Sequence, residues 1–172
     1  MSADVEELPE GWVWSSLGES CVLVSGAGFP LEFQGKKGSC YPFFKVGNLG
    51  EVASGEYLTF SPNSVDEVLA KQLGAKIIPK DAVVFAKIGM AIRLNRRRLV
   101  GRECCIDNNM MAAVPTRAIS ARFLLRFLET VEFMPLATAT TVPSLRKSAL
   151  GGRLRNGNTT KSLNIRQCEL CK

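Results

Sequence analysis

The chain has 172 residues, of which 46% are hydrophobic and 22% are charged, and its formal net charge is +6. This composition predicts a globular domain and excludes an intrinsically disordered chain, and no apolar run reaches the length of a membrane span. The sequence contains no histidine, which excludes histidine-based acid–base catalysis and zinc sites with a histidine ligand. The N-terminal stretch is acidic, unlike a secretory or transit peptide, so we expect a cytoplasmic protein without membrane contact.

Short strand patterns alternate with loops in the first half of the chain. The β-rich runs predict strands over residues Cys21–Ser25 and 41–46, and residues 12–14 predict a short strand or an anchoring segment. Residues 26–41 are rich in glycine and predict a loop. Ser64-Val-Asp-Glu67 fits a capping box, so we expect a helix that ends near Leu73.

The second half adds buried strands and one amphipathic helix. We expect strands over residues 82–88, 92–100 and 110–114. Apolar residues then recur at helical spacing, at Ile119, Phe123, Leu124, Phe127, Leu128 and Val131. They predict a helix from near Ser120 to before Pro135 whose apolar stripe packs on a sheet formed by residues 41–46, 82–88 and 110–114. Residues 136–150 are expected to form a loop.

These elements together predict an α+β fold, with a mixed, mostly antiparallel sheet and a few packed helices. Residues 1–150 would form a single domain. Residues 151–172 are polar and lack apolar periodicity, so we expect a disordered tail there.

Positive charge is concentrated in two blocks of the sequence. Residues 76–102 hold eight Lys or Arg against Asp81 alone, and residues 146–172 hold seven against Glu169 alone. Such a distribution is typical of a protein that binds a polyanion. A solvated basic surface without a partner would give the same pattern.

Sequence motifs for catalysis and metal binding are incomplete. The adjacent Cys104 and Cys105 and the lone Cys168-x-x-Cys171 do not complete a zinc site, so we expect reduced thiols and no metal. Residues 22–28 resemble the start of a dinucleotide fingerprint, but Leu31 stands where its third glycine should fall. No Walker A sequence and no acid-x-Lys nuclease core occur. We therefore expect a protein without cofactor that is not an enzyme.

Several segments carry a resemblance to one family. Leu8-Pro-Glu-Gly-Trp12, followed by Leu17-Gly-Glu19, is similar to the opening of a target recognition domain in the specificity (S) subunit of type I restriction–modification systems. The segment YPFFKVGNL, residues 41–49, resembles a family segment in which Asp is common at position 48. The segment IPKDAVVFAKIG, residues 78–89, resembles a family strand, and the match continues through residues 92–96, 104–110 and 140–147.

The resemblance implies a domain that reads one half of a bipartite site on double-stranded DNA. Partner methyltransferase and restriction subunits would perform the chemistry. The family usually continues with an IPxPPxxEQ segment and a long spacer helix, whereas residues 149–156 read ALGGRLRN. The sequence thus resembles a first half-subunit truncated or replaced at its end, and this difference predicts impaired assembly with methyltransferase subunits.

Cations can bind phosphates or read guanine, and Asn can read adenine. The predicted DNA contacts are Lys87, Arg93, Asn95, Arg96, Arg97, Arg98, Arg102, Asn108, Asn109, Arg146 and Lys147. Lys36 and Lys37 are secondary candidates. Two alternatives stay open at this point, a general nucleic-acid-binding module without sequence specificity and a non-functional truncated product.

Overall fold

The computed structural model describes residues 12–52, 57–151, 154–156, 159–161 and 163–166. The strands are β1 (Trp12–Ser15), β2 (Cys21–Ser25), β3 (Tyr41–Phe44), β4 (Tyr57–Leu58), β5 (Ser64–Val65), β6 (Val83–Ala86), β7 (Arg97–Val100), β8 (Cys105–Ile106), β9 (Met110–Pro115), β10 (Leu154–Asn156), β11 (Thr159–Lys161) and β12 (Leu163–Arg166). The α-helices are α1 (Leu17–Ser20), α2 (Glu67–Gln72), α3 (Ala121–Glu129) and α4 (Lys147–Gly151). The 3-10 helices are η1 (Leu31–Phe33), η2 (Val46–Gly50), η3 (Met90–Leu94) and η4 (Met134–Leu136).

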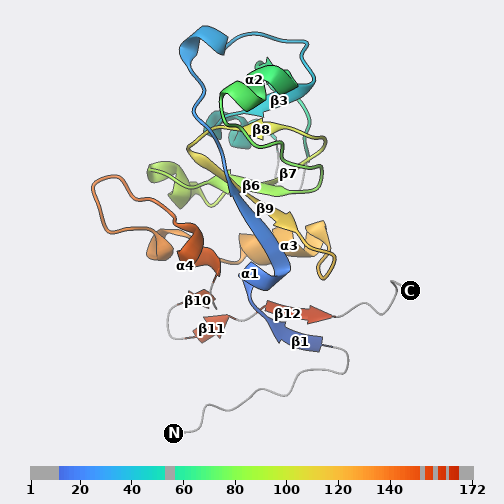
Figure 1. Ribbon diagram of the computed structural model, residues 1–172. Helices are drawn as coiled ribbons and strands as arrows, with labels where there is room; N and C mark the ends of the chain where they lie inside the picture. The colour runs from blue at the N-terminus through green and yellow to red at the C-terminus, as the bar shows by residue number, and fades with distance from the viewer. Residues whose placement is uncertain (1–11, 53–56, 152–153, 157–158, 162, 167–172) are drawn as a thin grey trace, which may run out of the picture.

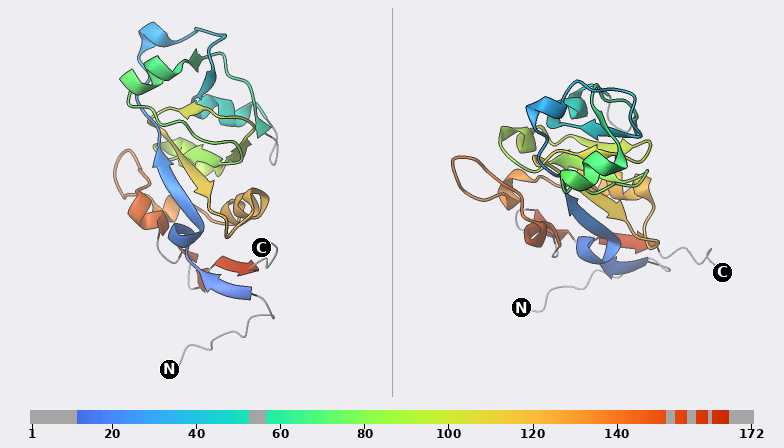
Figure 2. Two further views of the ribbon diagram at one scale, coloured as in Figure 1. Left: turned by 45° about the vertical axis from the view of Figure 1, so that its right-hand side comes forward. Right: turned by 45° about the horizontal axis from the view of Figure 1, so that its top comes forward.

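Two sheets stack on each other in the centre of the molecule. A five-stranded sheet has the order β2-β9-β6-β7-β4, and a three-stranded sheet has the order β5-β3-β8. The pairs β3–β8 and β4–β7 are parallel, and the others in these sheets are antiparallel. Figures 1 and 2 show α3 below the five-stranded sheet and α2 beyond the three-stranded one. The predicted α+β class with a mixed, mostly antiparallel arrangement is confirmed.

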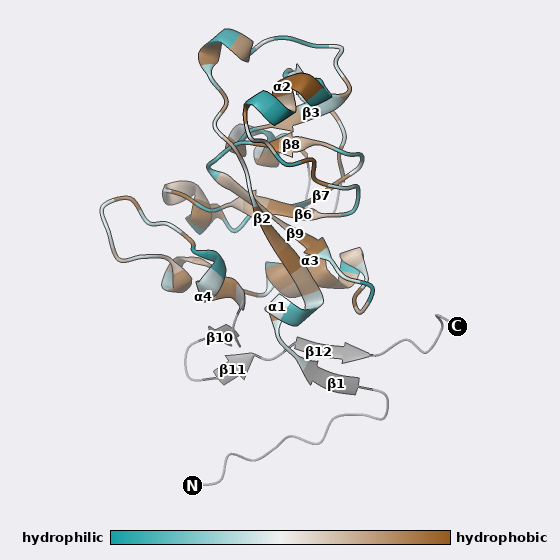
Figure 3. Ribbon diagram, in the orientation of Figure 1, coloured by the Kyte–Doolittle hydropathy of each residue, from teal (hydrophilic) through white to brown (hydrophobic). Residues whose placement is uncertain are grey.

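The first core layer lies between α3 and the five-stranded sheet. Val83 and Phe85 of β6 pack there with Leu124 and Leu128 of α3, and Figure 3 shows the hydrophobic colouring of β9 and α3. Each buried Leu side chain contributes about 1.5–3 kcal/mol. The predicted helix and its packing against the sheet are confirmed, although Phe123 of the expected apolar stripe is 38% exposed.

A second core layer lies between the two sheets. Side chains alternate along a strand, so Val84 of β6 points away from α3 and packs with Phe44 and Ile106 of the three-stranded sheet. We predicted residues 41–46 in the same sheet as β6 and β9, and this was wrong, because β3 pairs with β5 and β8. Phe43 faces α2 on the other side, so both faces of β3 are buried. An apolar run of this kind does not reveal which sheet a strand joins.

Several predicted boundaries also change. Residues 92–100 do not form one strand, because Gly89 and Asn95 have φ of +74° and +50° and these turns enclose η3. The N-cap of α2 is Asp66, whose Oδ1 accepts the backbone N–H of Leu69 at 2.8 Å, whereas Ser64 lies in β5. Residues 136–150 were expected to form a loop, but Leu136 is the last residue of η4 and the residues from Lys147 onward form α4.

The ends of the described chain lie close together. β1 pairs antiparallel with β12, and β10 pairs antiparallel with β11. The described residues of the segment after residue 150 include these paired strands, and the expected disorder of the tail stays a prediction. A sequence signal for β12 is the alternation of apolar and polar residues in Leu163-Asn-Ile-Arg166. The proposed domain boundary at residue 150 stays a prediction. No helix in the described part of the chain is long and apolar enough to cross a membrane.

Candidate nucleic-acid interface

Antiparallel pairing brings several polar segments to one end of the five-stranded sheet. The C-terminal ends of β2 and β6 both lie beside the N-terminal end of β9, and the C-terminal end of β6 also lies beside the N-terminal end of β7. The connections at this end carry Lys87, Arg93, Arg96, Asn108 and Asn109, which the sequence predicted as DNA contacts. Arg93, Arg96 and Asn108 are exposed, and the other two side chains are half-buried. The sheet topology thus gathers candidates from separate parts of the sequence.

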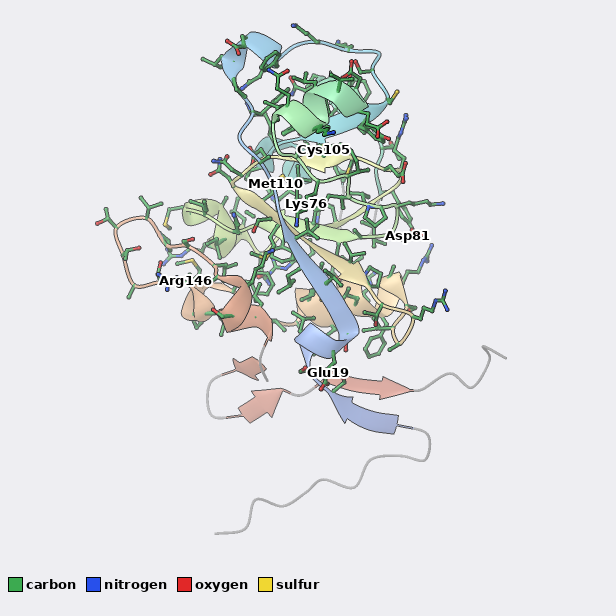
Figure 4. All side chains as sticks on the ribbon, viewed as in Figure 1. Glu19, Lys76, Asp81, Cys105, Met110 and Arg146 are labelled. Carbon is green, nitrogen blue, oxygen red and sulfur yellow. The ribbon has the colours of Figure 1, made fainter. Side chains whose placement is uncertain are left out.

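The segment before α4 joins the same end. Its Leu145 backbone N–H donates to the carbonyl of Lys87 at 2.8 Å, and the N–H of Gly89 donates to the carbonyl of Pro143 at 2.8 Å. Arg146 and Lys147 follow directly, and both are exposed. Figure 4 shows Arg146 on the left of the molecule, on the side opposite to Asp81, which precedes β6.

The three-stranded sheet contributes one further cation, Lys45. β3 and β8 are parallel, and the N–H of Asp107 donates to the carbonyl of Phe44 at 3.0 Å, which places Lys45 next to the 107–109 turn. Its Nζ donates to Oε1 of Gln34 at 2.8 Å. Lys45 was not among the contacts predicted from the sequence, although its position directly after an apolar strand was a signal. We call this end of the sheet the basic edge, formed by Lys45, Lys87, Arg93, Arg96, Asn108, Asn109, Arg146 and Lys147.

Asp107 shapes the turn that presents the two asparagines. Asp107 is only 6% exposed, and Oδ1 of its carboxylate accepts the backbone N–H of Asn109 at 2.8 Å. Burial raises the pKa of Asp107, and hydrogen bonds from Asn109 and the charges of Lys45 and Lys87 oppose this shift. Burial and the neighbouring Lys147 lower the pKa of Lys87. Positive charges therefore outnumber negative charges around the carboxyl group of Asp107.

Close backbone contact also fixes this turn. The N–H of Gly26 donates to the carbonyl of Met110 at 3.2 Å, and the N–H of Ala27 donates to that of Ile106 at 3.0 Å. A Cβ atom on Gly26 would lie 1.9 Å from the carbonyl oxygen of Asp107. Only glycine permits this approach, so the end of β2 and the 107–109 turn form one rigid unit.

The exposed cations of the basic edge are available to a ligand. In the described part of the chain, none of Arg93, Arg146 and Lys147 forms a salt bridge. Arginine and lysine side chains bind phosphate oxygens, and the amide of Asn108 can donate and accept at a base edge. The arrangement suits a duplex whose backbone is held by cations while amides face its bases.

Arg97 and Arg98 do not belong to this surface, which corrects the sequence-based prediction. They lie in β7, where they are 1% and 7% exposed. The Arg97 guanidinium lies 3.6 Å from the centroid of the Phe133 ring and donates to the carbonyl of Val131 at 3.3 Å. Burial lowers the pKa of Arg97 to about 9. Arg98 donates through Nε to the carbonyl of Val52 at 3.0 Å. Both side chains therefore pack inside the protein.

The remaining predicted contacts are occupied or distant. Asn95 binds Arg97 Nη2 through Oδ1 at 2.6 Å and donates through Nδ2 to the carbonyl of Glu129 at 3.3 Å, so we assign it a structural role. Arg102 lies beyond the opposite end of β7 and donates to the carbonyl of Cys40 at 2.8 Å. The secondary candidates Lys36 and Lys37 lie in the loop between η1 and β3, where the carbonyl of Lys36 accepts the N–H of Ser64 of β5 at 2.8 Å.

The described cysteines are free thiols, namely Cys21, Cys40, Cys104 and Cys105. Burial raises the pKa of Cys21 to about 12 and that of Cys105 to about 11. Among the described residues, no group of three or more potential ligands could hold a metal ion. Cys168 and Cys171 lie outside the described residues, so the interpretation of their spacing stays a prediction.

The sequence matches no protein-family model and no curated protein, whereas several solved structures share its fold. A chain from a structure on complex assembly and conformational transition of the type I R-M system aligns with a TM-score of 0.63 and 21% identity, over 88% of this chain and 35% of that one. The HsdS subunit from Thermoanaerobacter tengcongensis aligns with a TM-score of 0.58 and 20% identity, over 95% and 34% of the two chains.

A third similar structure is the type I restriction–modification S subunit from M. genitalium, with a TM-score of 0.51 and 16% identity over 92% of this chain and 35% of that one. The present chain thus spans about a third of the length of these three chains. At these identities the likeness establishes the fold, and at that level it confirms the resemblance found in the sequence. The chain therefore has the fold of part of a type I restriction–modification specificity subunit.

Proposed function

We propose that the chain is a DNA target recognition domain of a type I restriction–modification specificity subunit. It reads one half of a bipartite site on double-stranded DNA and is itself not an enzyme. Methyltransferase and restriction subunits in the cytoplasm supply the chemistry.

The basic edge carries this proposal. Its exposed cations come from the β6–β7 connection and from the segment that enters α4, and all lie at one end of one sheet. Between them, the 107–109 turn is held by the carboxylate of Asp107 and by the close approach of Gly26. A rigid turn with amide side chains, flanked by cations, supports base reading beside phosphate binding.

Sequence specificity distinguishes this function from a general nucleic-acid-binding module. The test is to select duplexes from a random library with the purified full chain, and then to measure binding of the selected duplex against scrambled competitors. We expect a short enriched sequence and a preference that persists in excess competitor. Equal binding of selected and scrambled duplexes would instead indicate the general module, and binding of neither would indicate a non-functional product.

Salt dependence provides a second, independent measurement. Phosphate contacts by Lys and Arg release counterions, so the logarithm of the binding constant should fall linearly with the logarithm of salt concentration. Each phosphate contact contributes about 0.9 to the slope on duplex DNA. A slope near zero on the selected duplex would contradict a phosphate-binding role for the basic edge.

A further inference from the structure

Three apolar side chains lie exposed beside the cations of the basic edge. Met90 and Leu94 of η3 are 58% and 57% exposed, and Val142 in the loop before α4 is 57% exposed. Single exposed apolar residues are common on protein surfaces, but a group of them flanked by cations indicates a contact surface.

Backbone pairing joins the two segments that carry these side chains. Ile88 and Ser144 form an antiparallel bridge, and the N–H of Gly89 donates to the carbonyl of Pro143 at 2.8 Å. Met90 begins η3 directly after Gly89, and Val142 directly precedes Pro143, so the two residues flank this hydrogen bond. Leu94 follows Met90 within the same 3-10 helix. The two segments are therefore neighbours, and each carries exposed apolar side chains.

The loop that carries Val142 is closed by its own hydrogen bonds. The N–H of Thr138 donates to the carbonyl of Ser144 at 3.0 Å, and the N–H of Ser144 donates to Thr138 Oγ1 at 3.1 Å. Thr140 Oγ1 donates to the carbonyl of Val142 at 2.8 Å. These bonds fix the backbone at Val142 before any ligand binds, which lowers the entropic cost of binding there.

The exposed cations around this surface select its partner. Arg93 lies between Met90 and Leu94 in the sequence of η3, and Arg146 and Lys147 follow the loop that carries Val142. A partner that complements this surface therefore carries negative charge close to an apolar group. In the major groove of DNA, the one apolar group at a base edge is the 5-methyl group of thymine, and phosphates border the groove.

We propose that Met90, Leu94 and Val142 form a contact surface for thymine 5-methyl groups in the major groove of the bound duplex. This inference rests on the proposed function and makes it more specific. The three side chains are each little more than half exposed and come from two neighbouring segments, which fits methyl contact better than insertion of one side chain between base pairs.

Deoxyuridine tests this inference, because it differs from thymidine only by the missing methyl group. The duplex selected by the full chain is compared with the same duplex carrying deoxyuridine in place of each thymidine. We expect the unchanged protein to bind the deoxyuridine duplex about fourfold more weakly for each methyl group that it touches. The variant M90A/L94A/V142A should bind the thymidine duplex correspondingly more weakly and show no difference between the two duplexes.

The variant V22A/V68A serves as a matched control, because it removes exposed apolar side chains from β2 and α2, and it should retain the preference for thymidine. If M90A/L94A/V142A does not fold, the binding of V142A to the thymidine and deoxyuridine duplexes is compared instead. Equal binding of both duplexes by the unchanged protein, or a thymidine preference retained in M90A/L94A/V142A, would overturn the inference and leave the proposed function intact. Failure to bind any duplex would overturn both.

Discussion

β7 and the basic edge both carry arginine side chains, which are buried in β7 and exposed at the basic edge. Arg97 and Arg98 lie in a strand that is covered on both faces, and their guanidinium groups bind backbone carbonyls and the Phe133 ring. Arg93 and Arg146 lie in connections at the strand ends and remain exposed. Position relative to the strand end, rather than charge density in the sequence, therefore separates structural arginines from those available to a ligand.

Removing Arg97 should produce the largest effect on stability. Arg97→Ala leaves a cavity against Phe133 and removes the hydrogen bonds to Val131 and Asn95, so we expect a loss of about 3–4 kcal/mol in the free energy of unfolding. Arg93→Ala, the matched exposed variant, should change it by less than about 0.5 kcal/mol. Urea unfolding measures both. Equal stability of the two variants would contradict the structural assignment of Arg97.

Substituting Gly26 should give the next largest effect. The new Cβ of Gly26→Ala would clash with backbone atoms of Asp107, and we expect a loss of about 2–3 kcal/mol because backbone must shift. Gly28→Ala is the control, since a Cβ there meets no atom within 4 Å. Thermal unfolding compares the pair, and a Gly26→Ala variant as stable as Gly28→Ala would show that the 107–109 turn is not held by this contact.

Asp107 should give a smaller effect that depends on pH. Because burial raises the pKa of Asp107, the folded state binds its proton more tightly than the unfolded state does. The stabilisation is full below the ordinary pKa of about 4 and is lost as pH rises through the raised pKa of the folded state. Asp107→Asn removes this titration and keeps an oxygen for the N–H of Asn109.

The stability of Asp107→Asn relative to the unchanged protein should therefore increase as pH rises from about 4 toward neutrality, and then become constant. Urea unfolding of both proteins at a series of pH values measures this difference. A difference that does not change with pH, or that changes in the opposite direction, would contradict the burial of an ionisable carboxyl group at this turn.

The fold could be predicted from local patterns where those patterns are unambiguous. The stripe formed by Leu124 and Leu128 has helical spacing, and β6 and β9 are apolar runs of strand length, so the helix and its packing on the sheet followed from the sequence. The partner of β3 did not follow, because a strand buried on both faces has no alternation that reports its neighbours.

The candidate site could be predicted only in part. The basic character of residues 76–102 was visible in the sequence, but β7 buries Arg97 and Arg98 within that block. The proximity of Lys45 to Asp107 depends on a parallel strand pair between residues about 60 positions apart in sequence. The position of Lys45 directly after an apolar strand marks a strand end, but long-range pairing leaves no local signal that this strand end lies beside the 107–109 turn.

The central claim is that the basic edge, and not the net positive charge of the protein, binds duplex DNA. The most direct test compares R93A/R146A/K147A with K80A/R117A/R122A. Each variant removes two arginines and one lysine, but the second set lies outside the basic edge. Both proteins should fold with unchanged stability, and duplex affinity at several salt concentrations is the measurement.

We predict that R93A/R146A/K147A binds the selected duplex about tenfold or more weakly than the unchanged protein. The slope of log binding constant against log salt concentration should flatten by about 0.9 for each phosphate that the variant no longer binds. K80A/R117A/R122A should bind nearly as tightly as the unchanged protein. Equally weakened binding in the two variants would contradict the claim, because it would show that binding depends on overall charge and not on the basic edge.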